Sequence, residues 1–241
     1  MQRPEHPYAA LGDPEAARPP LRVLVTAGPT EEPIDEVRFI GNRSSGQLGI
    51  AVARAFADSL PSAGSEVVLA LGPVRTALPA PDAGQCAIRV ERFRTAADLQ
   101  AIMTRELREA DVVVMAAAVA DFRPVTREEG KLRRGEARAL ELEPVQDLLS
   151  ATRASRKHGA LVIGFALEPR EELERSALGK LERKDLAAIV ANPLETMDAP
   201  DIDATLYLRD GRVRRAAPPG TRIAKTDFAR WLAAEALALR A

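Results

Sequence analysis

Three groups of polar residues in this sequence have the types and spacing needed to handle a polyphosphate. The segment from Ser44 to Gly49 combines serines with two glycines, whose missing side chains let backbone N–H groups approach an anion. Lys131 stands two residues before a pair of arginines, and cations on a loop can neutralise a charged leaving group. Lys180 and Lys184 are four residues apart and therefore share one face of a helix. Together these groups predict chemistry on negatively charged substrates.

Each group also has a purely structural interpretation. Ser44 can serve as a helix N-cap, with Gly46 and Gly49 present only to let the helix lie close to a sheet. Most basic runs are solvated surface, which applies to the loop lysine and to the helical pair. The thirteen residues between Gly28 and Asn42 favour a functional interpretation, because such a long connection between strand and helix is usually functional or disordered. These glycines do not fit GxGxxG, so an ordinary nicotinamide-binding motif is not supported.

Asp121 lies at a position where a ligand group could be held. It follows the apolar run 111–120, and there its carboxylate could bind a divalent metal or a substrate hydroxyl or amide. The alternative is a loop carboxylate that caps Arg123 or a backbone N–H. The sequence around Asp121 leaves both interpretations open.

Strand and helix patterns alternate along the chain and supply a scaffold for these residues. Short apolar runs predict strands at 21–25, 65–71, 87–93, 111–120, 160–166 and 187–190. Apolar residues at helical spacing predict helices at 44–60, 95–107, 171–184 and 226–239. This alternation predicts an α/β fold with a Rossmann-like, doubly wound, mostly parallel sheet. Ligands of such sheets bind at the carboxyl ends of the strands, where Gly28 and residues 118–121 should lie.

The remaining segments predict a flap and a small hairpin. Residues 121–146 begin as a charged, turn-rich stretch and predict a flap with a short strand at 140–143. Asp147 is expected to cap a helix that runs through Lys157. Asp210-Gly211 predicts a C-terminal β-hairpin between 205–208 and 212–215. We expect residues 1–20 to be a disordered leader and residues 21–241 to form a single domain.

Composition excludes several classes of function. The chain has 241 residues, 34 Lys and Arg against 35 Asp and Glu, so no global positive field favours nucleic acid. A single cysteine, Cys86, excludes an intrachain disulfide framework, and two histidines give little support to a histidine-based triad. The sequence lacks an apolar run of eighteen residues, which argues against a membrane span. We expect a cytoplasmic protein without nucleic-acid or membrane partners.

Four stretches resemble the phosphopantothenate-cysteine ligase family, also described as the C-terminal half of a bifunctional pantothenate-metabolism flavoprotein. TAGPTEEPIDEVRFIGNRSSGQLG, residues 26–49, looks like the signature of this family. AAAVADFRP, residues 116–124, is similar to its second motif. KLRR, residues 131–134, resembles a Lys-x-Lys-Lys motif with arginine at the last two positions, Arg133 and Arg134. KLERKDLAAIVAN, residues 180–192, resembles the nucleotide site with its Lys-x-x-x-Lys.

The resemblance implies a role for individual residues. It implies catalytic roles for Asn42 and Lys131, substrate contacts from Asn42, Ala117, Ala118 and Asp121, and a Mg²⁺ ligand at Asp121. The nucleotide-binding positions that it implies are Gly28, Ser44, Gly46, Gly49, Asp121, Lys131, Val145, Gln146, Asp147, Leu148, Phe165, Lys180, Lys184 and Asn192. Val145-Gln146 departs from the usual Asn-Pro of the family, whereas Asp147 is kept. Without the resemblance, Asn42 would most simply be a turn residue.

The resemblance also implies a reaction. We expect a ligase of coenzyme A biosynthesis that joins 4'-phosphopantothenate to L-cysteine, using CTP and Mg²⁺ through an acyl-cytidylate and releasing CMP and pyrophosphate. A homodimer is implied as well. We expect no flavin in this chain, because the residues before Leu21 are too few for the decarboxylase often fused there, which we expect as a separate protein. The alternatives are a catalytically impaired binding homologue and a nicotinamide-dependent oxidoreductase on the same scaffold.

Overall fold

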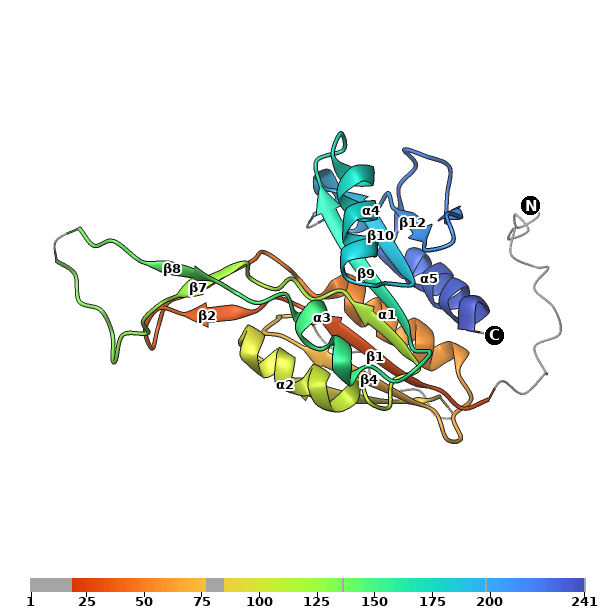
Figure 1. Cartoon of the computed structure of the whole chain (residues 1–241), viewed down its shortest axis with the longest axis horizontal. Coiled ribbons are helices and arrows are strands. Elements are labelled where there is room, and N and C mark those ends of the chain that lie inside the picture. The colour runs from red at the N-terminus through yellow and green to blue at the C-terminus, as the bar shows by residue number, and fades with distance from the viewer. Residues whose placement is uncertain (1–18, 77–84, 136, 198, 241) are drawn as a thin grey trace, which may run out of the picture.

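The structure is a computed structural model that describes residues 19–76, 85–135, 137–197 and 199–240 (Figure 1). The predicted leader, residues 1–20, lies outside the described residues except for its last two positions. No helix within the described ranges is both long and apolar enough to cross a membrane.

An eight-stranded sheet forms the centre of the fold. Its strands lie in the spatial order β13 (Val213–Arg215), β12 (Thr205–Leu208), β10 (Ala188–Pro193), β9 (Leu161–Glu168), β6 (Val112–Met115), β1 (Arg22–Ala27), β4 (Glu66–Leu71) and β5 (Ala87–Arg92). The strands from β10 to β5 are parallel, and β12 and β13 add an antiparallel edge. The prediction of a doubly wound, mostly parallel sheet is therefore confirmed.

The order in which strands are added to the sheet reverses between β1 and β6, although the two strands are parallel. Numbered by their order of appearance, the parallel strands read 3-2-1-4-5-6 across the sheet, from β5 to β10. The chain moves outward from β1 on one side and outward from β6 on the other. Ligands of such sheets bind beyond the carboxyl ends of the strands at this reversal. The residues that follow β1 and β6 are therefore the first place to look for a site.

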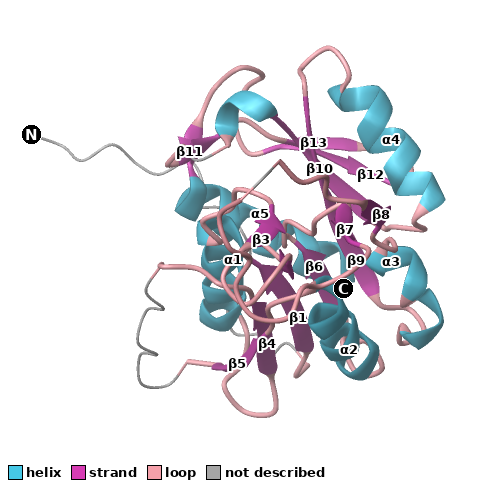
Figure 2. Ribbon diagram, turned by 90° about the vertical axis from the view of Figure 1, so that its left-hand side faces the viewer, coloured by secondary structure: helices cyan, strands magenta, loops and turns pink. Residues whose placement is uncertain are grey.

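Helices cover both faces of the sheet (Figures 1 and 2). They are α1 (Gln47–Ser59), α2 (Ala96–Glu106), α3 (Leu148–Ala151), α4 (Leu173–Arg183) and α5 (Lys225–Arg240). Alternate side chains of β1 point to opposite faces of the sheet. Val23 and Val25 belong to the core that also contains side chains of α1 and α5, whereas Leu24 belongs to the core that contains side chains of α2, α3 and α4. In α5, the ring of Trp231 lies 5.4 Å from that of Phe228. The sheet is thus apolar on both faces, as a parallel sheet requires.

The strand predicted at 111–120 is shorter than expected. β6 ends at Met115, after which the chain leaves its ladder with β9. The Ala117 N–H donates to the hydroxyl of Thr26 (3.1 Å), which takes the place of a ladder hydrogen bond. Ala118 then forms an isolated parallel bridge with Pro29. The chain after β6 is therefore held beside the chain after β1.

Two antiparallel hairpins extend from the sheet, and we call them the arm (Figure 1). The segment after β1, predicted as a loop, contains β2 (Glu31–Pro33) paired with β3 (Phe39–Gly41). The predicted flap begins and ends with β7 (Phe122–Pro124) and β8 (Leu142–Pro144), so its predicted strand at 140–143 is displaced toward the C-terminus. β2 and β7 lie side by side. Strands of three residues depend on these pairings, which no local pattern reveals.

Asp35 fastens the flap to the β2–β3 hairpin. Its carboxylate accepts hydrogen bonds from the N–H groups of Val37 (2.7 Å), Arg38 (2.6 Å) and Leu132 (3.1 Å). The Arg38 guanidinium also donates to the Leu132 carbonyl (3.2 Å). Burial alone would raise the pKa of Asp35, but these donors lower it to about 2. The residue next to Lys131 is therefore held on the hairpin.

Two helix boundaries differ from the predictions. α1 begins at Gln47 rather than at Ser44, with Gly46 as its N-cap in the left-handed region (φ 71°). α3 stops at Ala151 rather than reaching Lys157, and the chain tightens into the 3₁₀ turn η1 (Arg153–Ser155). The Thr152 hydroxyl donates to the Leu148 carbonyl (2.6 Å), a local bond that competes with a regular helix.

The C-terminal hairpin agrees with its prediction. β12 pairs with β13, and Asp210-Gly211 lies in the connection. A second 3₁₀ turn, η2 (Leu194–Thr196), follows β10. Beyond it, β11 (Asp201–Ile202) pairs with β14 (Ile223–Ala224) directly before α5. These short elements close the end of the sheet near the start of α5.

Candidate active site

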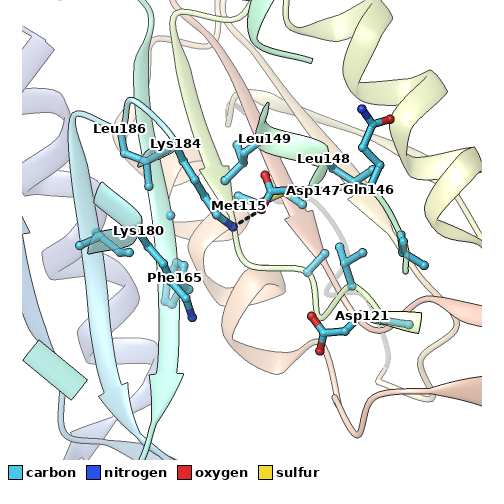
Figure 3. A pocket seen from close by; sticks show the side chains of 16 residues that line it. Met115, Asp121, Gln146, Asp147, Leu148, Leu149, Phe165, Lys180, Lys184 and Leu186 are labelled. Atoms are coloured by element: carbon cyan, nitrogen blue, oxygen red, sulfur yellow. Dashed lines mark ion pairs between the residues drawn. The ribbon is translucent and has the colours of Figure 1, made fainter. Parts of the chain in front are cut away.

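A cavity of about 240 Å³, the Lys180 cavity, lies between α4 and the segment that leads into α3. The predicted site residues that line it are Ala117, Asp121, Val145, Gln146, Asp147, Leu148, Phe165, Lys180 and Lys184. Figure 3 shows the two lysines projecting from one side and Asp121 lying across the opening from them. Residues predicted from four separate stretches of sequence are thus brought together.

Both lysines of α4 are paired with carboxylates. Lys180 Nζ lies 2.6 Å from Oε1 of Glu168, and Lys184 Nζ lies 2.5 Å from Oδ2 of Asp147. The Lys180 ammonium lowers the pKa of Glu168, helped by Ser176. Burial would raise the pKa of Asp147, but Lys184 and the Ser150 N–H outweigh it and lower this pKa. The lysine side chains are only 26% and 21% exposed, so they belong to the cavity and not to a solvated stripe.

Asp147 has two roles in this geometry. It caps α3, as predicted, by accepting a hydrogen bond from the Ser150 N–H (2.9 Å). It also reaches across to Lys184, as the dashed line in Figure 3 marks. The neighbouring Gln146 amide points away from the lysines in that view. The ion pair therefore joins the two walls of the Lys180 cavity.

A second cavity of about 230 Å³, the Gly46 cavity, lies at the N-terminus of α1. The predicted residues that line it are Ser44, Gly46, Gly49, Ala117, Ala118, Phe165 and Asn192. The N-cap of α1, Gly46, has no side chain to bond the helix, and the Gln47 N–H makes a long hydrogen bond to the Ser45 hydroxyl (3.4 Å). The first N–H groups of an uncapped helix, together with the helix dipole, favour an anion at this end. The cavity therefore has the character of a phosphate site.

The two cavities are adjacent. Ala117 and Phe165 line both of them, and they follow β6 and lie within β9 respectively. Asn192 donates to the Thr196 hydroxyl (3.0 Å) at the far side of the Gly46 cavity. The Gly46 cavity lies at the carboxyl ends of β6, β9 and β10, where the fold predicts a ligand, and the Lys180 cavity extends from the end of β6 along β9 to Ile189 near the start of β10. Two ligands placed in them would meet at Ala117 and Phe165.

The glycines of the signature also serve packing. A Cβ on Gly49 would lie 2.5 Å from the Cβ of Ala27, so glycine is needed for α1 to lie against β1. Gly28 has φ +84°, and a Cβ there would lie 2.9 Å from Val74. Gly28 lines neither cavity. The structural interpretation thus holds for Gly49 and Gly28, while Gly46 and Gly49 also line the Gly46 cavity.

Two predicted catalytic residues lie outside both cavities. Lys131 is exposed on the flap, within the arm that Figure 1 shows away from the sheet. Asn42 is exposed, and its Nδ2 donates to the carbonyl of Val119 (2.8 Å), which lines the Lys180 cavity. In this conformation Asn42 supports the chain after β6.

The surroundings of Asp121 determine how Mg²⁺ could be held there. Among the described residues, no group of three or more His, Cys, Asp or Glu side chains could hold a metal ion by itself. The Asp121 carboxylate is exposed at the mouth of the Lys180 cavity, and Arg123 pairs with Glu143 (2.8 Å) rather than with Asp121. Mg²⁺ is commonly held by one or two carboxylates and the phosphates of a nucleotide. Asp121 fits that mode of binding.

Two basic residues near the Gly46 cavity were missed by sequence reasoning. Arg43 and Lys225 line this cavity beside the start of α1. Arg43 lies within the GNRSSG stretch, so its position was a usable signal. Lys225 directly precedes the predicted helix 226–239, and only the fold brings it to the cavity.

The chain is similar to a known protein family and to several curated proteins. The family described as the DNA/pantothenate metabolism flavoprotein C-terminal domain matches residues 20–239. The curated coenzyme A biosynthesis bifunctional protein CoaBC of Mycolicibacterium smegmatis is 37% identical over 193 residues, 76% of this chain and 44% of that protein. A cysteine/cysteine sulfinic acid decarboxylase of an unknown prokaryotic organism is 42% identical over 175 residues, 72% of this chain and 46% of that protein. The chain spans about half the length of these curated relatives.

Solved structures show the same fold. A crystal structure of the C-terminal domain of CoaBC matches with a TM-score of 0.71 and 32% identity, covering 91% of this chain and 95% of that one. The Cab2 mutant H337A in complex with phosphopantothenate-cysteine matches with a TM-score of 0.68 and 19% identity, over 91% of this chain and 86% of that one. The second likeness concerns the fold alone.

Proposed function

Because this chain belongs to the family of the DNA/pantothenate metabolism flavoprotein C-terminal domain, we propose that it is a phosphopantothenate-cysteine ligase of coenzyme A biosynthesis. The observation that carries the proposal is the pair of adjacent cavities that meet at Ala117 and Phe165. The Lys180 cavity has two lysines for a nucleotide, and the Gly46 cavity has the N-terminus of α1 for a phosphate. Such a site can hold two anionic reactants side by side.

The proposed reaction has two steps. The carboxylate of 4'-phosphopantothenate attacks the α-phosphate of CTP, which forms an acyl cytidylate and releases pyrophosphate. The amine of L-cysteine then attacks the acyl carbon and displaces CMP. The first step is needed because a carboxylate has no adequate leaving group, and the mixed anhydride provides one.

The residues of the chain serve mainly to bring like charges together. Lys180 and Lys184 bind the nucleotide beside Phe165. The resemblance implies a nucleotide contact at the first turn of α1 as well, but we assign this turn to the phosphate of phosphopantothenate, because it lines the other cavity. Mg²⁺, held by Asp121 and the nucleotide, would neutralise phosphate charge. Lys131 is proposed to act after movement of the flap, and Asn42 to hold the acyl intermediate.

A homodimer is proposed from the surface of the arm. Of the ten large hydrophobic side chains that are exposed among the described residues, six belong to the arm: Val37, Phe39, Phe122, Val125, Leu140 and Leu142. Clustered exposed apolar side chains mark interaction surfaces. A second copy of the chain would cover them. We further propose a cytoplasmic location, in keeping with a lone, buried cysteine.

Pyrophosphate release with a panel of nucleotides tests the proposed function. We expect release with CTP that depends on phosphopantothenate, and formation of CMP that depends on cysteine. If ATP is the only nucleotide that supports release, the proposed nucleotide changes from CTP to ATP, and the proposed reaction stands. If no nucleotide supports release, the chain is not a ligase. A chain that still binds nucleotide would then be a catalytically impaired homologue, the alternative suggested by Arg133, Arg134 and Val145-Gln146.

A further inference from the structure

Arg156 joins two segments that form opposite walls of the Lys180 cavity. Its Nη2 donates to the carbonyls of Leu149 (2.7 Å) and Lys184 (3.2 Å), and its Nη1 donates to the carbonyl of Asp185 (3.0 Å). Leu149 belongs to α3, which Asp147 caps, whereas Lys184 and Asp185 end α4. Arg156 itself does not line the cavity.

The end of α4 has an unusual backbone that depends on arginines. Asp185 has φ 52°, and among the described residues it is the only non-glycine residue with positive φ. A non-glycine residue in the left-handed region is uncommon, and contacts with its surroundings help to hold it there. The Asp185 carboxylate pairs with Arg153 (2.6 Å) and with Arg209, while its carbonyl accepts from Arg156. This turn fixes where Lys184 leaves the helix.

The Nε group of Arg156 indicates that the side chain is placed to contact the three carbonyls, at the expense of its own Nε hydrogen bond. Nε of Arg156 is buried and has no hydrogen-bond partner in the structure. Leaving a buried donor unsatisfied costs stability. The guanidinium nevertheless lies where its two outer nitrogens reach three carbonyls, two of them at the negative end of the α4 dipole.

We propose that Arg156 is a positioning residue for the nucleotide. By holding α3 to the end of α4, it sets the separation between the Asp147 wall and the lysine wall, and so the place of the Lys184 ammonium. This inference rests on the proposed function, because it assigns the nucleotide to the Lys180 cavity. The Gly46 cavity is independent of Arg156, so phosphopantothenate should bind normally without it.

The test compares Arg156→Met and Arg156→Lys with Arg153→Met. Arg153 also contacts Asp185 but bonds neither Leu149 nor Lys184, which makes its variant the matched control. For Arg156→Met we expect the KM and the calorimetric Kd of CTP to rise about tenfold, with kcat and the KM of phosphopantothenate within about twofold. Arg156→Lys keeps the charge but can reach fewer carbonyls, so its KM for CTP should lie between those of the wild type and Arg156→Met. Arg153→Met leaves Arg209 paired with the Asp185 carboxylate and keeps all three carbonyl contacts of Arg156, so it should stay close to the wild type.

The outcomes separate the two proposals. If the wild type releases pyrophosphate but Arg156→Met keeps the CTP constants of the wild type, the positioning role is wrong and the ligase function stands. Equal losses for CTP and phosphopantothenate would also overturn it, because they indicate general damage. If Arg156→Met does not fold, Arg156→Lys decides by the same comparison. If the wild type binds no nucleotide, both proposals fail.

Discussion

The Asp147–Lys184 and Glu168–Lys180 pairs give the Lys180 cavity its electrostatic character. Each lysine is paired with one carboxylate. A nucleotide phosphate would compete with these carboxylates for the ammonium groups. Such half-buried pairs keep long side chains ordered, so less side-chain entropy is lost when a ligand binds.

The pH dependence of the Asp147–Lys184 pair has a definite sign. The pKa of Asp147 is lowered in the folded state, so the pair stabilises the protein above the ordinary aspartate pKa of about 3.9. This contribution is lost as the pH falls through the lowered folded pKa. We expect Asp147→Asn to reduce the free energy of unfolding by a constant amount from about pH 5 to 8, and by less below about pH 4.

Urea unfolding of the wild type and of Asp147→Asn across this pH range measures the effect. Asp210→Asn is the comparison for an exposed pair: Arg212 also lowers the pKa of Asp210, but solvent screens this pair, so the loss of stability should be smaller. A difference between the wild type and Asp147→Asn that persisted unchanged at the lowest pH would show that the carboxylate acts through something other than its charge.

At the scale of elements, the contact of α1 with β1 depends on Gly49. Gly49→Ala would place a Cβ 2.5 Å from that of Ala27 and 3.0 Å from the carbonyl of Thr26, both part of a strand that cannot move easily. We expect a loss of about 1–3 kcal/mol in the free energy of unfolding, measured by urea titration.

Gly179→Ala on α4 is the matched control for this substitution. The nearest atom to a Cβ there is the flexible end of Arg183 at 4.0 Å. Alanine is a better helix former, so this change should stabilise the protein by about 0.5–1 kcal/mol. If Gly49→Ala were equally stabilising, the close approach of α1 to β1 would be incorrect.

The flap depends on the hydrogen bonds of Asp35. Asp35→Asn removes the charge that accepts from Leu132, Val37 and Arg38, which should loosen the flap. Trypsin cleaves after lysine and arginine, and residues 131, 133 and 134 are of these types. We expect cleavage in the flap to become roughly tenfold faster, followed by mass spectrometry of the fragments. Cleavage at the wild-type rate would mean that Asp35 does not hold the flap.

Sequence reasoning recovered those elements whose signals are local. The strands 21–25 and 160–166 are short runs that are apolar apart from Arg22, and each corresponds to a strand of the sheet. The helical spacing of Lys180 and Lys184 correctly predicted a shared face. β2, β3 and β7 were missed because three residues carry no reliable period, and their stability comes from partners distant in the chain.

The candidate site was only partly predictable for the same reason. The resemblance pointed to most of the residues around the Lys180 cavity. The partners that fix them, such as Glu168 for Lys180, depend on how β9 and α4 pack. The three carbonyls that converge on Arg156 have no sequence signal, because any residue can supply a carbonyl.

At the scale of the whole molecule, the arm is expected to govern assembly. Phe122 is 51% exposed on β7, and Phe122→Lys would place a charge within the apolar surface of the arm. If this surface joins two copies, the dimer Kd measured by sedimentation velocity should rise at least roughly tenfold. Leu178→Lys alters a comparably exposed leucine (41%) on α4, outside the arm, and should have no effect. Unchanged association of both variants would remove the arm from the interface.

The Phe228–Trp231 contact provides an optical probe of the folded state. Trp231 is the one tryptophan of the chain, it packs against the core through α5, and it lines neither cavity. Its fluorescence should therefore change when the core opens and stay constant when a ligand occupies the site. Emission from this single indole can report denaturation without interference from substrate, so ligand-induced stabilisation becomes measurable on the unlabelled protein.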